Sequence, residues 1–200
     1  MIPGVIVSYA QNFEDVLLWR ALRDIGAGFY IDIGAQDPVI DSVSRGFYEQ
    51  GWRGIHVEPS PHYADLLRRD RPDEVVIQSA VTDNPGLLTF FEVPDTGMST
   101  GIAELAEFAV TRGWSVRKTT VPAVTLDSIL SLSDGRDVHW LKIDVEGLER
   151  EVLKGWRESS VRPWVVLLES ITPWREHVHQ KWEPLLLEKG YEFVYFDGLN

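Results

Sequence analysis

The chain has 200 residues, of which 44 % are hydrophobic, and a formal net charge of −12. This length suffices for one well-packed core and is short for two, so we expect a single domain over residues 1–200. The acidic charge disfavours nucleic-acid binding, because phosphate backbones need clustered Lys and Arg. The absence of cysteine excludes disulfides and thiolate metal sites and is typical of a cytoplasmic protein. No apolar run approaches the roughly 18 residues of a membrane span, and the first residues lack a signal-peptide pattern.

Helices and strands are predicted to alternate along the chain. Ser8 and Gln11 form a capping box for a helix that ends near Arg23, so residues 1–24 are expected to cap the fold. The next elements are a strand at 29–33, a helix from Asp41, a strand at 54–58, a helix at 61–69 and a strand at 74–81. Extended segments at 87–93 and 118–124 then flank a helix at 102–112.

The second half continues this alternation. A short helix starts at Thr125 and is followed by a strand at 138–145, a helix at 146–155, a strand at 164–169, a helix at 176–189 and a strand at 191–196. The central strands are almost continuously apolar and the helices are amphipathic. This pattern is typical of an α/β fold whose mainly parallel sheet is covered by helices on both faces.

Two carboxylates occur near the ends of the first two central strands. Asp32 lies in the first strand, Gly34 begins the turn that leaves it, and Glu58 ends the second strand. The carboxyl ends of parallel strands form the ligand crevice of an open α/β sheet, where a glycine lets a ligand approach the backbone. A carboxylate such as Glu58 offers two acceptor oxygens to the two hydroxyls of a ribose. The pattern predicts a nucleotide site, the structural alternatives being a water-facing Glu58 and an Asp32 that caps loop amides.

The turn after the first strand indicates which nucleotide is bound. A dinucleotide fold carries G-x-G-x-x-G at this point, whereas Gly34 is followed here by Ala-Gln-Asp-Pro. The carboxylate of Asp37 would also repel a phosphate. The turn therefore favours a cofactor with ribose and adenine but no phosphate, such as S-adenosyl-L-methionine, over a nicotinamide dinucleotide.

Seven stretches, in order, resemble the FkbM family of S-adenosylmethionine-dependent methyltransferases nearly from end to end. They are SYAQNFED (8–15), DIGA (32–35), FYEQGWRGIHVEP (47–59), VTLD (124–127), WLKIDVEG (140–147), RPWVVLLE (162–169) and YFDGLN (195–200). Many members carry Asn-x-Gly where this chain has Gln36-Asp37-Pro38, and the proline predicts a different pocket wall there. Relatives often continue past the last stretch into a final strand, whereas this chain stops at Asn200.

The resemblance implies a Rossmann-like methyltransferase fold whose final antiparallel strand is missing from this chain. It also implies methyl transfer to a hydroxyl of a sugar or related small natural product, and fusion to or association with glycosyltransferase domains. By this analogy Glu58 holds the ribose, and Asp144 faces the reacting centre. The cofactor-binding residues that the resemblance implies are Asp32, Gly34, Ala35, Glu58, Ser79, Ala80 and Asp144.

The catalytic candidates lie at the ends of the fourth and fifth central strands. They are Lys142, Asp144 and Glu169, with Glu146 as a further acid in what we expect to be the first turn of a helix. Lys142 beside Asp144 favours the charged form of both, and a charged carboxylate is a weak base toward a sugar hydroxyl. Either a less solvated base acts, or a metal acidifies the hydroxyl. Asp144 and Glu169 offer the oxygen ligands that Mg²⁺ prefers, although acids at strand ends also cap helices.

The acceptor pocket is expected to come from the loops 94–101 and 170–178, where Trp174 can stack on a carbohydrate. A second function class stays open, namely a catalytically weak or inactive methyltransferase-like module that acts as a scaffold in a larger glycan-modifying protein. The intact Asp32, Glu58 and Asp144 favour the enzyme. The proline after the first turn and the end at Asn200 are compatible with the scaffold.

Overall fold

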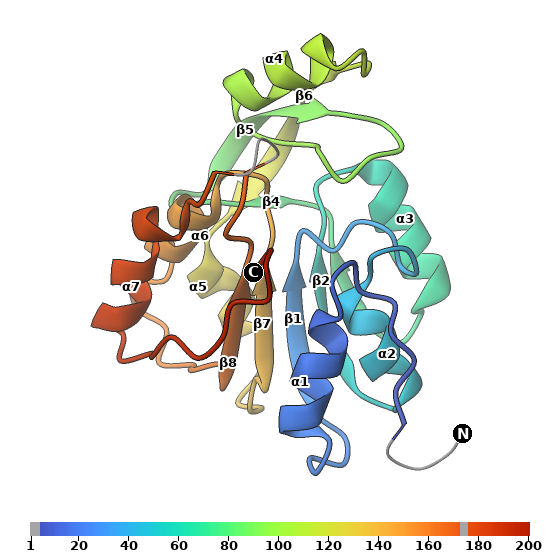
Figure 1. Cartoon of the computed structure of the whole chain (residues 1–200), viewed down its shortest axis with the longest axis vertical. Helices are drawn as coiled ribbons and strands as arrows, with labels where there is room; N and C mark the ends of the chain where they lie inside the picture. The colour runs from blue at the N-terminus through green and yellow to red at the C-terminus, as the bar shows by residue number, and fades with distance from the viewer. Residues whose placement is uncertain (1–4, 173–175) are drawn as a thin grey trace.

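The computed structural model describes residues 5–172 and 176–200. Figure 1 shows a large sheet between two layers of helices, with a smaller sheet and one helix above it. The strands of the large sheet are β1 (Phe29–Ile33), β2 (Arg53–Val57), β3 (Val75–Ile77), β7 (Trp140–Ile143) and β8 (Val165–Leu168). They run in the order β3-β2-β1-β7-β8 and every pair is parallel. The predicted α/β architecture with a mainly parallel sheet is therefore confirmed.

Six helices form the two covering layers (Figure 1). One layer contains α1 (Glu14–Leu22), α2 (Val43–Glu49) and α3 (Pro61–Asp70). The other contains α5 (Leu126–Ser131), α6 (Glu149–Lys154) and α7 (Glu183–Glu188), with the short 3₁₀ helix η1 (His179–Lys181) before α7. None of the helices in the described part of the chain has the length and apolar character needed to cross a membrane.

The side chains of β1 alternate between these two layers. Ile31 and Ile33 pack in a core with the residues of α5, α6 and α7. Tyr30 points to the opposite face, where it stacks on Trp140 with ring centroids 4.5 Å apart and joins a core with α1 and α2. Successive side chains of a strand point to opposite faces, so a strand covered on both sides is apolar throughout. Asp32 is the exception within β1.

A second, smaller sheet lies above the carboxyl ends of the large one (Figure 1). It contains β4 (Ala80–Val81), β5 (Gly86–Glu92) and β6 (Arg117–Val124) in the order β4-β6-β5. β5 and β6 are antiparallel, and α4 (Ala103–Thr111) lies between them in the sequence. This sheet has a core of its own, made by Ala80, Phe90, Val121 and Ala123. The small sheet therefore covers the edge of the large sheet at which the sequence predicts a ligand site.

The prediction of a capping box at Ser8 is wrong, because α1 begins only at Glu14. The preceding Phe13 has a left-handed φ of 64°, which breaks the helical path. The buried Asp15 organises this turn instead. Its carboxylate accepts hydrogen bonds from the backbone N–H groups of Tyr9, Ala10 and Val16 and from the hydroxyl of Ser8.

Three other predicted elements differ from the structure. The strand expected at 74–81 divides into β3 and β4, because a turn in which the Ser79 N–H donates to the Ile77 carbonyl takes the chain out of the large sheet. The helix expected at 176–189 is limited to η1 and α7, since Pro184 fits only the first turn of a helix. The segment 191–196 is not a strand, and the side chains of residues 193–196 are exposed. Within the described residues the large sheet has β8 at one edge.

Candidate functional site

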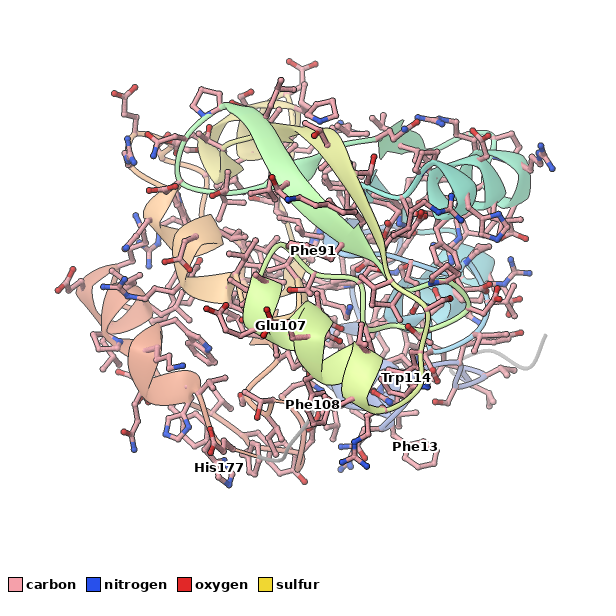
Figure 2. The ribbon with its side chains drawn as sticks, turned by 90° about the horizontal axis from the view of Figure 1, so that it is seen from above. Phe13, Phe91, Glu107, Phe108, Trp114 and His177 are labelled. Atoms are coloured by element: carbon pink, nitrogen blue, oxygen red, sulfur yellow. The ribbon has the colours of Figure 1, made fainter. Side chains whose placement is uncertain are left out.

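The carboxyl ends of β1, β2, β7 and β8 open into a cavity of about 560 Å³. This volume lies within the usual range for small-molecule sites. Figure 2 looks down onto this edge, with β5, β6 and α4 nearest to the viewer and with Phe13 and His177 on the side of α4 away from the β5–β6 ribbon. Leu88 and Phe90 of β5 and the loop 96–101 contribute to the lining. The cavity is therefore enclosed between the large sheet and the small one.

All of the predicted site residues except Asp32 line this cavity. They are Gly34, Ala35, Glu58, Ser79, Ala80, Lys142, Asp144 and Glu169. The expected acceptor loops also contribute, through residues 96–99 and 101 and through Ile171 and Thr172. Trp174, the predicted stacking residue, lies outside the described residues. The fold thus brings together predicted residues that are up to 135 positions apart in the sequence, from Gly34 to Glu169.

Glu58 is a buried carboxylate that the backbone holds in place at the end of β2. Its two oxygens accept hydrogen bonds from the N–H groups of Ser60, at 2.7 Å, and Gln36, at 3.0 Å. Burial raises the pKa of Glu58 to about 7, and the two N–H groups lower it only in part. Each carboxylate oxygen keeps further acceptor capacity. Glu58 can therefore accept two more donors from a ligand in the cavity.

Gly34 allows the ends of β1 and β7 to contact each other closely. Its φ is +77°, and a Cβ at this position would overlap the backbone carbonyl oxygen of Asp144. The sequence predicts that a ligand approaches the backbone at this glycine. In the structure the closest approach to Gly34 comes instead from the Asp144 carbonyl, in the turn after β7. The same glycine still lines the cavity. It lets the ends of β1 and β7 meet without a side chain between them.

Lys142 and Asp144 form an ion pair at the floor of the cavity, with Nζ 2.9 Å from Oδ2. Burial alone would lower the pKa of Lys142, but the carboxylates of Asp144 and Asp32 outweigh it and raise this pKa above its ordinary value. Lys142 is therefore a fixed ammonium group. Among the described residues that line the cavity, it is the single Lys, Arg or His.

Three carboxylates gather beside this ion pair. Oxygens of Asp144, Glu146 and Glu169 lie within 4.8 Å of one another. Burial, and then the charges of Asp144 and Glu146, raises the pKa of Glu169 well above its ordinary value. The pKa of Glu146 is raised for the same two reasons, burial and the nearby acids. These residues can either hold a divalent cation or act as unusually basic carboxylates.

Glu146 joins this cluster from a turn and not from a strand, so the alternation of side chains along β7 does not predict its position. β7 ends at Ile143, and Glu146 has a left-handed φ of 51° in the turn that follows. The prediction that Glu146 begins a helix is therefore wrong, because α6 starts at Glu149. Glu149 holds the turn, since its Oε1 accepts the N–H groups of Val145 and Gly147.

Ser79 lies at the cavity with its hydroxyl turned toward the protein. The hydroxyl oxygen is 2.9 Å from the carbonyl oxygens of both Ala80 and Pro122, to which it donates. Ser79 thus connects β4 to β6 and can offer a ligand an acceptor oxygen. Its proton is already engaged by the backbone.

Two parts of the wall were missed by the sequence reasoning. Gln11 lines the cavity from the turn before α1 and Glu14 from the first residue of α1, and Gly198 and Leu199 line it from the last residues. The two segments are bound together, since the Asn200 side-chain amide donates to Glu14 at 3.0 Å. The last residues are also bound to the loop after β8, because the Ser170 N–H donates to the Leu199 carbonyl. Both parts of the wall belong to stretches that resemble the FkbM family, and this likeness was the only signal in the sequence that could have found them.

Comparisons with known proteins were made against family models, curated proteins and solved structures. The model of the Methyltransferase FkbM domain matches residues 32–193, which is more than half of the chain. Neither the search of curated proteins nor that of solved structures found a match. The match spans all five strands of the large sheet except the first three residues of β1, together with most of the residues that line the cavity at their carboxyl ends. The chain belongs to the FkbM methyltransferase domain family.

Proposed function

We propose that this protein is an S-adenosyl-L-methionine-dependent O-methyltransferase that acts on a hydroxyl of a sugar or a related small acceptor. One observation carries the proposal, namely the buried carboxylate of Glu58 at the end of β2. Two backbone N–H groups hold it, and it borders a cavity of about 560 Å³. A carboxylate in this position of an α/β fold is suited to accept the two hydroxyls of a ribose.

The donor set of the cavity fits this cofactor better than a nucleotide with phosphates. The described lining of the cavity has Lys142 as its single basic residue, whereas a pyrophosphate brings two negative charges. Pyrophosphate sites use glycine-rich turns at helix N-termini, whereas the turn after β1 passes through Gly34 to a loop fixed by Glu58. Acids at the opposite end of the cavity suit the positive charge of a sulfonium group. The adenosine would lie between Glu58 and Ser79.

The reaction needs an acceptor hydroxyl to be positioned and its proton to be removed. When bound, the cofactor supplies a methyl group on a positively charged sulfur. Asp144 is fixed by its ion pair with Lys142 and orients the acceptor hydroxyl. Glu169 is the nearby carboxylate suited to take the proton in its ionised form, which the positive charges of Lys142 and of a bound sulfonium favour and which its raised pKa otherwise disfavours. The loop 96–101 and the small sheet border the cavity, where they would limit the access of water to the reacting groups.

We expect Glu169→Gln to stabilise the fold increasingly as the pH rises. The pKa of Glu169 is higher in the folded than in the unfolded chain. Its contribution to stability is therefore complete below the pKa of a free glutamate and is lost as the pH increases toward the raised folded value. The melting temperature of the variant should exceed that of the wild type at about pH 8 and approach it at about pH 4.5.

The same measurement decides between a free base and a metal ligand. The exposed acid Glu104 of α4 provides the control, and Glu104→Gln should show no such pH dependence. A cation held by Asp144, Glu146 and Glu169 would instead raise the wild-type melting temperature when MgCl₂ is added, and Glu169→Gln would lose that gain. This result would make Glu169 a metal ligand.

Transfer itself is tested with cofactor that carries a radiolabelled methyl group. The protein is incubated with a panel of monosaccharide methyl glycosides, and label in the acceptor is measured before and after treatment that cleaves esters but leaves ethers intact. Ether-linked label on a glycoside supports O-methylation of a sugar hydroxyl. Cofactor binding without transfer to any member of the panel would favour another small acceptor, and a protein that binds no cofactor would favour the scaffold.

A further inference from the structure

Asp32 is a buried carboxylate that does not reach the cavity. Its residue is 1 % exposed, and its Oδ1 has no hydrogen-bond partner among the described residues. Two positively charged or chargeable groups flank it at 3.9 Å, namely Nζ of Lys142 and Nδ1 of His56. His56 is held from its other side, with Nε2 2.7 Å from a carboxylate oxygen of Glu74. Of these two groups only Lys142 lines the cavity, so Asp32 is connected to the cavity through Lys142.

The sheet register explains this arrangement. Asp32 of β1 is directly opposite Lys142 of β7, and on its other side it is opposite His56 of β2. Side chains at paired positions of neighbouring parallel strands point to the same face. Lys142 is long enough to extend past Asp32 to the carboxyl edge, where its Nζ reaches Asp144 and lies 3.5 Å from the carbonyl oxygen of Gly34. Asp32 lies beneath Lys142 as a result.

An ammonium group has three N–H donors. In Lys142 one donor is used by Asp144, another is directed to the Gly34 carbonyl, and Asp32 contributes charge at 3.9 Å. The remaining capacity faces a cavity whose described lining holds five more acids, namely Glu14, Asp41, Glu58, Glu146 and Glu169, and no other basic residue. An anionic group on a ligand would find its one cationic partner in that lining at Lys142.

We propose that Lys142 binds the carboxylate at the amino-acid end of the cofactor, and that Asp32 is a positioning residue that holds Lys142 in place. The inference rests on the proposed function, because it assigns a part of the same cofactor. Asp32 acts without touching the ligand. The negative charge of Asp32 keeps the Lys142 ammonium at the cavity floor, between Asp144 and the turn after β1.

Two ligands that differ only at the amino-acid end test this assignment. S-Adenosylhomocysteine carries the α-amino acid, whereas 5′-methylthioadenosine has the same adenosine and a thioether but no carboxylate. Calorimetry measures the affinity of both for the wild type, Asp32→Asn, Lys142→Met and the double variant. We expect Lys142→Met to weaken binding of S-adenosylhomocysteine by about tenfold or more and to leave that of 5′-methylthioadenosine within about twofold.

The double variant separates positioning from direct contact. If Asp32 acts only through Lys142, Asp32→Asn weakens S-adenosylhomocysteine binding in the wild-type background and has no further effect once Lys142 is methionine. The double variant also removes the buried charge that Lys142→Met leaves unpaired, so a folding defect of the single variant does not obscure the comparison. Asp37→Asn is the matched control, since the half-buried Asp37 is not part of the cavity lining and its carboxylate accepts the N–H groups of Val39 and Ile40.

Three outcomes would overturn the inference. Equal losses for both ligands in Lys142→Met would show that Lys142 does not contact the amino-acid end. Additive losses in the double variant, or a loss of 5′-methylthioadenosine binding in Asp32→Asn, would show that Asp32 acts independently of Lys142. If the wild type binds neither ligand, the proposed function itself fails, and this result is distinct from the other two.

Discussion

Gly34→Ala is expected to be among the most destabilising single substitutions in this chain, with a loss of more than about 4 kcal/mol in the free energy of unfolding. The added methyl group would overlap the carbonyl oxygen of Asp144, and the backbone at Gly34 has a left-handed φ of +77°. Neither turn can move away easily. The Gly34 N–H donates to the Val57 carbonyl at 2.9 Å, and the Asp144 N–H donates to the Ile33 carbonyl at 3.1 Å.

Gly51→Ala separates the two causes of this loss. Gly51 has a similar φ of +88°, but a Cβ there would meet no atom within 4 Å. That variant should lose only about 1–2 kcal/mol, the cost of placing an L-residue in the left-handed region. Urea unfolding of both variants gives the comparison. A Gly34→Ala protein that is as stable as Gly51→Ala would show that the ends of β1 and β7 do not meet as closely as described.

Glu58→Gln is expected to weaken cofactor binding and to stabilise the unliganded fold at alkaline pH. The affinity for S-adenosylhomocysteine should fall by about 1.5–3 kcal/mol, the range for hydrogen bonds to a charged group. The stability effect has the opposite sign, because burial raises the pKa of Glu58 from 4.5 to about 7. The wild type thus keeps the full contribution of Glu58 below pH 4.5 and loses it as the pH rises to about 7.

The magnitude of this pH effect follows from the shift. A change from 4.5 to about 7 corresponds to about 3 kcal/mol, most of which falls between pH 5 and pH 8. The amide of the variant cannot accept from both Ser60 and Gln36, but that cost does not vary with pH. The difference in unfolding free energy between the variant and the wild type should therefore increase by about 2–3 kcal/mol from pH 5 to pH 8. A difference that does not change with pH would contradict the buried, titrating Glu58.

The fold could be predicted from the sequence to the extent that hydrophobic patterns determine it. Strands such as 29–33 and 164–169 are almost continuously apolar, and this identifies them as parallel strands covered on both faces. The same reasoning misjudged 74–81 and 191–196, because an apolar run does not reveal whether a neighbouring strand is available to pair with it. In the structure the first run divides between two sheets, and the second pairs with no strand of the described chain.

The site was predictable where a residue lies at the end of a central strand. Glu58, Asp144 and Glu169 line the cavity for that reason. Asp32 does not, because its position one residue before the end of β1 places its carboxylate beneath Lys142. Glu14 lines the cavity and is held there by a contact with Asn200, at the other end of the chain. No local sequence pattern encodes contacts of this kind.

The central claim is that Glu58 and the cavity beside it bind an adenosyl group without phosphates. Isothermal titration of the wild type with S-adenosylhomocysteine and, separately, with NAD tests it most directly. We predict saturable one-to-one binding of S-adenosylhomocysteine and no detectable heat with NAD. Tight binding of NAD, or the absence of binding by S-adenosylhomocysteine, would contradict the assignment of this cavity.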